Sequence, residues 1–198
     1  MASARRKAKI KRVTKETAVS VNINLDGTGK TNIKTRLSFI DHLIMSIGKH
    51  AMIDITLNGE SNDGIVHHFT EDVAIALAQS IDKALGDRTR ITRFGYALVP
   101  MDEALAYVSI DLVKRQYHNV QLNLTRDSIE GVPREDLEHF TRSLLQNLNA
   151  CTHMAVYYGE NDHHKVEAAL KAFAVALRMA TNIDKKRKGV PSAKGAMQ

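Results

Sequence analysis

The sequence carries one histidine motif twice. Each copy reads His-His-x-x-Glu, in "DGIVHHFTED" and again in "ENDHHKVEAA". Its members are His67, His68 and Glu71 in the first copy and His163, His164 and Glu167 in the second. On a helix, adjacent residues point about 100° apart, so two neighbouring imidazoles are poorly placed to bind one ion but well placed to serve two. The spacing therefore favours a pair of metal sites, and each glutamate is a candidate for either of them.

Two further histidines fall on the same duplication. His42 precedes His67 by almost the same interval as His139 precedes His163, so six of the nine histidines follow one repeated pattern. Divided evenly, the set supplies three imidazoles and one carboxylate to each of two ions. This leaves coordination positions open, as in a catalytic rather than a structural site. Imidazole with carboxylate suits Mn, Fe, Zn, Co or Ni.

Composition indicates an ordinary soluble globular protein. The 198 residues fit one compact domain or two small ones, with 43% hydrophobic and 25% charged residues. No apolar run approaches the roughly 20 residues that span a bilayer, and the basic start lacks the apolar stretch of a secretory signal. We therefore expect a cytoplasmic protein that does not enter a membrane. One cysteine, Cys151, excludes an intramolecular disulfide and fits a reducing compartment.

The formal net charge of +6 comes largely from the two ends of the chain. The N-terminal run "ARRKAKIKR" is interpreted as a solvated tail. A nucleic-acid binder would need a basic stripe interleaved with aromatic residues. Aromatic residues make up only 5% of the chain, so nucleic acid is not expected as a partner.

Hydrophobic periodicity predicts the same order of elements in both halves. Strands are predicted at 17–25, 51–59, 93–99, 103–113, 117–124 and 151–159. Helices are predicted at 39–50, 69–87, 133–148 and 163–180. Each half thus runs strands, helix, strand, helix, which is an internal repeat of roughly ninety residues. We divide one compact domain into a basic tail (1–8), two half-repeats (9–90 and 91–182) and a C-terminal segment (183–198).

Several motifs resemble those of the imidazoleglycerol-phosphate dehydratase family. They are "FIDHL", "HHFTED", "RFG", "PMDEAL", "EHF", "NDHHKVEAALKAF" and "PSAKG", and they extend over nearly the whole chain. The resemblance implies an α+β fold in which a duplicated half-domain places four helices between two four-stranded sheets. It also implies a homo-oligomer, with trimers assembling into a 24-mer and active sites between subunits.

The same resemblance implies a reaction and its cofactor. Members dehydrate D-erythro-imidazole-glycerol phosphate to imidazole-acetol phosphate in histidine biosynthesis, using two manganese ions per active site. The ligands carried over are His42, His67, His68, Glu71, His139, His163, His164 and Glu167. A metal ion on an imidazole nitrogen would stabilise the deprotonated ring of the substrate. The glutamate of "KET", Glu16, is the implied acid or base.

The resemblance also assigns residues to the phosphate end of the substrate. These substrate-binding residues are His50, Arg93, Arg115, Lys171, Ser192 and Lys194. Guanidinium and ammonium groups match phosphate oxygens. The C-terminal "GVPSAKG" is thereby predicted to be a phosphate-binding loop rather than only a tail.

The chain also departs from the family pattern. Arg36, Ser38 and Ser46 replace residues usual in the family, and Ser46 is expected to alter one substrate contact. Asp102 and Glu103 are interpreted as turn or packing residues. A non-catalytic metal-binding shell protein, or another metal lyase or hydrolase on the same scaffold, remains an alternative.

Overall fold

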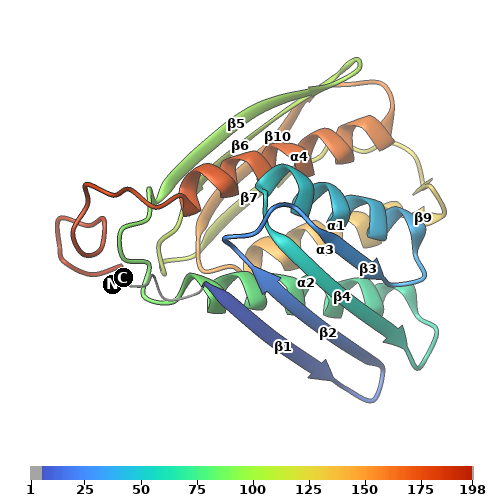
Figure 1. Cartoon of the computed structure of the whole chain (residues 1–198). Helices are drawn as coiled ribbons and strands as arrows, with labels where there is room; N and C mark the ends of the chain where they lie inside the picture. The colour runs from blue at the N-terminus through green and yellow to red at the C-terminus, as the bar shows by residue number, and fades with distance from the viewer. Residues whose placement is uncertain (1–5, 198) are drawn as a thin grey trace.

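The computed structural model describes residues 6–197, and both halves have the repeated order of elements (Figure 1). The first half contains β1 (Lys7–Val13), β2 (Thr17–Asn24), β3 (Thr31–Lys34), α1 (Ser38–Ala51), β4 (Asp54–Ser61) and α2 (Val66–Leu85). The second contains β5 (Phe94–Met101), β6 (Ala104–Asp111), β7 (Tyr117–Gln121), β8 (Ser128–Ile129), β9 (Val132–Pro133), α3 (Arg134–Gln146), β10 (Cys151–Tyr158) and α4 (Asp162–Thr181). The predicted order of strands, helix, strand and helix is confirmed in each half, and β8 with β9 adds a small hairpin before α3.

Each half builds one four-stranded sheet, and the two sheets have the same topology. Their strand orders are β1-β2-β4-β3 and β5-β6-β10-β7. The third strand of each half runs parallel to its neighbour, whereas the other pairs are antiparallel. The helices lie between the sheets (Figure 1), with α1 packed on α4 and α2 packed on α3. The predicted α+β sandwich is therefore confirmed.

Helix α4 lies close against the second sheet because both surfaces carry small residues. A Cβ added at Gly95 of β5 would lie 2.0 Å from the backbone oxygen of Ala176, so only glycine permits this approach. Ala172 and Ala176 of α4 are completely buried. Side chains packed at this density leave an element little freedom to shift, so the contact fixes the axis of the helix that carries the second histidine motif.

The interpretation of the basic N-terminal run as a solvated tail is wrong for residues 7–12. These residues form the edge strand β1, which pairs with β2 along its length. Ala8 and Ile10 pack against the core. The alternate, exposed positions are Lys7, Lys9 and Lys11. Lysines on an edge strand also discourage pairing with other chains. Residues 1–5 of the assigned tail lie outside the described residues.

Two other differences concern short or shifted elements. Strand β3 was not predicted, because only Ile33 of its residues is buried and the alternation is too short to detect. Helix α2 begins at Val66 rather than at residue 69, which places His67 and His68 in its first turn. Among residues 6–197, no helix is both long and apolar enough to cross a bilayer.

Candidate metal centre and active site

Three predicted ligands from opposite halves of the chain meet where the N-terminal parts of α1 and α4 pack together. His42 Nε2 lies 3.2 Å from Glu167 Oε1, and His163 Nε2 lies 3.1 Å from Glu167 Oε2. These ligating atoms all lie within 4.8 Å of one another. The α1–α4 cluster (His42, His163 and Glu167) lines a cavity of about 460 Å³ together with Phe39 and other residues. Such a group of nitrogen and oxygen atoms matches a divalent metal site.

The α2–α3 cluster (His67, Glu71 and His139) is the counterpart formed by the other two helices. His139 Nε2 lies 3.4 Å from Glu71 Oε1, and the His67 and His139 rings stack with centroids 4.3 Å apart. His139 Nε2 is buried and makes no hydrogen bond with any described residue. A buried nitrogen without a hydrogen-bond partner is unfavourable unless a ligand uses its lone pair, so His139 Nε2 has the character of a metal ligand.

The two clusters pair each glutamate with a particular histidine of the opposite half. Within one chain, Glu167 lies with His163 of its own motif and with His42 of the opposite half, and Glu71 lies beside His139 of the opposite half. Glu167 therefore belongs with His42 and His163, and Glu71 with His139. This pairing of residues from opposite halves follows from the packing of α1 on α4 and of α2 on α3.

A carboxylate lies on Nδ1 of each histidine in the two pairs. The distances are 2.7 Å from His67 to Asp136, 2.7 Å from His68 to Asp63, 3.1 Å from His163 to Glu130 and 2.6 Å from His164 to Glu103. A proton held on Nδ1 leaves the lone pair on Nε2, where a metal ion binds. Each of the four imidazoles thus has an acidic partner on Nδ1.

None of these four carboxylates was predicted from the sequence to contact a histidine of the motifs. Glu103 in particular was interpreted as a turn or packing residue, but its Oε2 accepts from His164, and its Oε1 accepts from the backbone N–H of Asn161 at 2.7 Å. These two hydrogen bonds, that of Asn161 first, lower the pKa of Glu103 to about 2. Asp102 does occupy the turn, with a φ of 47°. Because metal-bound histidines usually have acidic partners, the acidic residues near each element were a usable signal.

His68 and His164 contact carboxylates other than the two cluster glutamates, Asp63 in the case of His68 and Asp102 and Glu103 in the case of His164. The rings of His163 and His164 are nearly perpendicular, at 82°, and those of His67 and His68 are at 71°. This divergence is the one expected of neighbours on a helix. Glu16 Oε1 lies 3.8 Å from His68 Nδ1, so the predicted acid or base adjoins a predicted ligand.

Lys171 and His50 lie on the side of the α1–α4 cluster. Lys171 Nζ is 2.7 Å from Glu167 Oε1. Burial raises the pKa of Glu167, but hydrogen bonds from Lys171 and His42 outweigh that effect and lower the pKa to about 2. Partial burial and the charge of Lys171 lower the pKa of His50. Two predicted substrate residues therefore lie together with three predicted metal ligands.

Arg93 lies at the opposite end of α4. Its backbone N–H donates to the oxygen of Ala180, near the C-terminal end of that helix. Its guanidinium donates to both carboxylate oxygens of Asp111, at 2.7 and 3.0 Å, and to the oxygen of Pro191, at 2.8 Å. Arg93 thereby anchors the C-terminal loop beside the second sheet.

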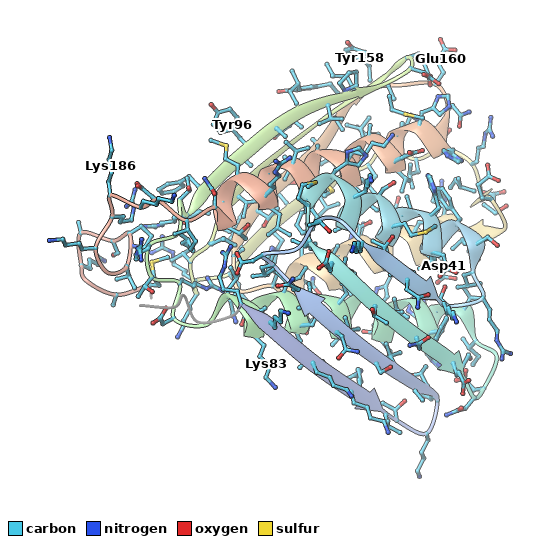
Figure 2. All side chains as sticks on the ribbon, viewed as in Figure 1. Asp41, Lys83, Tyr96, Tyr158, Glu160 and Lys186 are labelled. Atoms are coloured by element: carbon cyan, nitrogen blue, oxygen red, sulfur yellow. The ribbon has the colours of Figure 1, made fainter. Side chains whose placement is uncertain are left out.

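Other predicted phosphate residues accompany Arg93 at this end. Ser192 and Lys194 follow Pro191 in the loop, and the Ser192 Oγ accepts from the Lys194 N–H at 3.3 Å. Figure 2 places Lys186 of the loop and Glu160, at the start of α4, at opposite ends of the molecule. At 1.5 Å per helical residue, His163 and Ala180 lie about 25 Å apart. One chain alone therefore does not bring its metal ligands and this loop together.

The departures from the family pattern lie at different depths. Ser38 lines the cavity of the α1–α4 cluster. Ser46 is buried in α1 with 8% of its surface exposed. Arg36 precedes α1 with a positive φ of 67°. Arg115 is exposed on the loop between β6 and β7.

Comparison with known proteins identifies relatives over almost the whole chain. A family model described as imidazoleglycerol-phosphate dehydratase matches residues 35–177, a range that contains every predicted metal ligand. The protein of that name from Clostridium botulinum (strain Kyoto / Type A2) is 44% identical over 191 residues, which cover 96% of this chain and 97% of the relative. A relative of the same name from Phytophthora nicotianae is 43% identical over 97% of this chain, which spans only 42% of that relative's length.

A solved structure shares the fold. The crystal structure of the protein from Pyrococcus furiosus, in complex with (S)-C348, superposes with a TM-score of 0.80. The two sequences are 35% identical, and the alignment covers 94% of this chain and 99% of the other. The duplicated sandwich is therefore an arrangement that this chain shares with its relatives.

Proposed function

The chain belongs to the imidazoleglycerol-phosphate dehydratase family, and we propose that it performs dehydration with two metal ions held by its duplicated histidine motifs. It is a lyase that converts D-erythro-imidazole-glycerol phosphate to imidazole-acetol phosphate and water in histidine biosynthesis. The observation that carries the metal proposal is the α1–α4 cluster, in which the imidazoles of His42 and His163 face the carboxylate of Glu167. In the α2–α3 cluster, His139 faces Glu71 and its ring stacks on that of His67. Manganese is the proposed ion, since mixed nitrogen and oxygen ligands are compatible with it.

We propose that neighbouring subunits complete the active site. His68 and His164 contact Asp63 and Glu103 rather than the glutamates of the two clusters, and the loop containing Ser192 and Lys194 lies at the far end of α4 from His163. A neighbouring copy could supply its own histidine to each cluster and its own C-terminal loop to the substrate. The metal ligands and the phosphate-binding loop would then come together between subunits. The proposed assembly is a 24-mer built from trimers.

Side chains of this protein have defined tasks in the proposed reaction. When bound, the two ions would act as Lewis acids toward the imidazole ring of the substrate. Glu16 takes the proton from the carbon next to the one that loses hydroxide, so that a C–H and a C–O bond break and an enol forms. Glu16 then returns its proton to the carbon that lost hydroxide, and the enol O–H proton leaves with that hydroxide as water, which gives the ketone. General acid–base catalysis by a positioned carboxylate is well suited to both transfers.

Binding of the phosphate is assigned to the cationic residues. Lys171 and His50 lie beside the α1–α4 cluster, and Lys194, Ser192 and Arg115 approach from another subunit. Arg93 contributes by holding the C-terminal loop, because its guanidinium already donates to Asp111 and Pro191. Ammonium and guanidinium groups are the usual partners of phosphate oxygens.

We also place the enzyme in the cytoplasm. Its single cysteine, Cys151, is free, which fits a reducing compartment. Fractionation of cells that express the protein would test this placement.

The direct test combines turnover of imidazole-glycerol phosphate with metal content and particle size, each before and after chelation. Purified protein is expected to contain transition metal, to lose activity and large size on chelation, and to regain both with manganese. Full activity in metal-free protein would contradict the metal proposal. Metal binding without turnover would favour the alternative of a non-catalytic shell protein.

Glu16→Gln tests the proposed acid or base separately. Turnover should fall by about 10²–10⁴-fold, the usual contribution of general acid–base catalysis. Metal content and particle size should stay unchanged, because Glu16 is not a proposed ligand. Full activity in this variant would remove Glu16 from the reaction.

A further inference from the structure

Glu16 and Glu103 occupy equivalent positions in the two halves. Glu16 directly precedes β2 and Glu103 directly precedes β6, which are corresponding strands of the two sheets. Each carboxylate also lies beside the second histidine of a motif. Glu16 Oε1 is 3.8 Å from His68 Nδ1, and Glu103 Oε2 is 2.6 Å from His164 Nδ1. The duplication has therefore placed one glutamate next to each of these imidazoles.

In the second half, this glutamate is fully engaged. One oxygen of Glu103 receives the backbone N–H groups of Asn161 and Glu160, at 2.7 and 3.1 Å, and the other contacts His164. These contacts tie the turn between β5 and β6 to the start of α4. Glu103 is consequently held in one orientation, with its hydrogen-bonding capacity largely used.

In the first half, the corresponding histidine, His68, contacts the carboxylate of Asp63 instead of that of Glu16. Asp63 Oδ2 is 2.7 Å from His68 Nδ1, while Asp63 Oδ1 accepts from the backbone N–H of Ile65 at 2.9 Å. Asp63 thus makes the same two kinds of contact as Glu103, from another loop. The side chain of Glu16 is left 52% exposed.

We propose that Glu103 is a positioning residue that holds His164 with Nε2 presented to a metal ion, and that Asp63 does this for His68 so that Glu16 alone is free for proton transfer. A proton shared between Nδ1 and a fixed carboxylate determines the tautomer and the direction of the ring. His164 Nε2 lies on the exposed side, 3.4 Å from Asp102, whose side chain is 69% exposed. The inference rests on the proposed metal-dependent function and adds a division of labour between two duplicated carboxylates.

The first test compares metal affinity in Glu103→Gln, Glu16→Gln and Asp63→Asn, using manganese competition with a chelator on the assembled protein. Loss of the acidic partner of a ligating histidine typically weakens metal binding by about 10–100-fold. We expect that loss in Glu103→Gln and Asp63→Asn but not in Glu16→Gln. Wild-type manganese affinity in folded Glu103→Gln and Asp63→Asn would overturn the proposal.

Glu160→Gln is the matched control. Glu160, labelled in Figure 2, is a neighbour of Glu103, to which its backbone N–H donates, and its exposed side chain has no assigned role. The variant removes the same charge as Glu103→Gln and should keep wild-type metal affinity. An equal loss of affinity in Glu160→Gln would attribute the effect to net charge and overturn the positioning role. If Glu103→Gln does not fold, the manganese affinity of Asp63→Asn is compared with that of Glu16→Gln and Glu160→Gln instead.

The second test needs no metal. In the nitrogen-15 NMR spectrum of the chelated full-length protein, His164 should be protonated on Nδ1, and Glu103→Gln should shift it toward the Nε2–H form. A wild-type His164 with its proton on Nε2, or no change in the variant, would overturn the inference. Absence of metal from wild-type protein would instead contradict the proposed function, so the two failures are distinguishable.

Discussion

The two metal clusters have the same residue types but different surroundings. In the α1–α4 cluster, the side chain of Glu167 is only 6% exposed and pairs with Lys171. In the α2–α3 cluster, the side chain of Glu71 is 40% exposed. The residue one helical turn after the glutamate is Lys171 in α4 but Ile75 in α2. Duplication has therefore kept the ligands and changed the charge beside them.

This difference gives the clusters unequal tasks. An ammonium group next to a carboxylate repels a metal ion that would bind that carboxylate. The same ammonium attracts an anionic substrate. We therefore expect the α2–α3 cluster to bind metal more tightly and the α1–α4 cluster to lie closer to the phosphate.

The starts of the two motif helices differ in the same way. Before and after its histidine pair, α4 has Asp162 and Lys165, which form a buried ion pair at 2.8 Å, and Asp162 accepts the N–H of Thr125 at 2.8 Å. The corresponding residues of α2 are Val66 and Phe69. Polar contacts in one half and apolar packing in the other thus hold the same helical turn.

The largest effect is expected from removing one ligand of each cluster. His42→Ala and His139→Ala should each reduce turnover by at least about 100-fold, since even the loss of a ligand's acidic partner has effects of that order. Metal analysis should show loss from a different cluster in each variant. Retention of both ions in either variant would break the assignment of ligands to clusters.

Asp162→Ala should strongly destabilise the second half. It leaves the buried Lys165 without its anion, and breaking a buried pair in this way costs about 3–5 kcal/mol. The free energy of unfolding, measured with denaturant on metal-free protein, checks this value. Val66→Ala, at the corresponding position of α2, should reduce the free energy of unfolding by less, because no charge is left unpaired. Equal losses would contradict the comparison of the two helix starts.

Lys171→Met should separate the two tasks of the α1–α4 cluster. Removing the ammonium should strengthen metal binding there by roughly 10-fold, as expected for the loss of one nearby like charge. The KM for the phosphate substrate should rise at the same time. Ile75→Lys is the reciprocal variant and should weaken metal binding at the α2–α3 cluster. Unchanged affinities in both variants would show that the clusters are equivalent.

The smallest effect concerns acid stability of the metal-free protein. The pKa of Glu167 is lowered from the ordinary 4.5 to about 2. Its stabilising contribution is therefore complete above about pH 4.5 and is lost as the pH falls toward 2. Lys171→Met removes a hydrogen bond that lowers this pKa, so acid unfolding followed by circular dichroism should begin at higher pH. Glu71→Gln, in the exposed position, should leave the midpoint unchanged.

Much of the fold was predictable because its signals are local. Helical spacing of apolar residues revealed the four helices found in residues 6–197, and the internal repeat predicted the order of elements in each half. The sandwich itself was implied by the resemblance to the family. Strand β1 was missed because the lysines on its outer face outweighed Ala8 and Ile10 on its inner face. Strand β3 was too short to show alternation.

In the candidate site as well, the features that depend on local contacts were predictable from the sequence, and those that depend on distant contacts were not. The divergence of His67 from His68, and of His163 from His164, follows from rotation along one helix and was predictable from spacing. The partnership of His42 with Glu167 was not, because it depends on the packing of α1 against α4 from opposite halves. The contacts of Glu103 and Asp63 with their histidines likewise join separate elements. Residue order encodes the geometry of a single helix, whereas contacts between distant segments exist only after the core has packed.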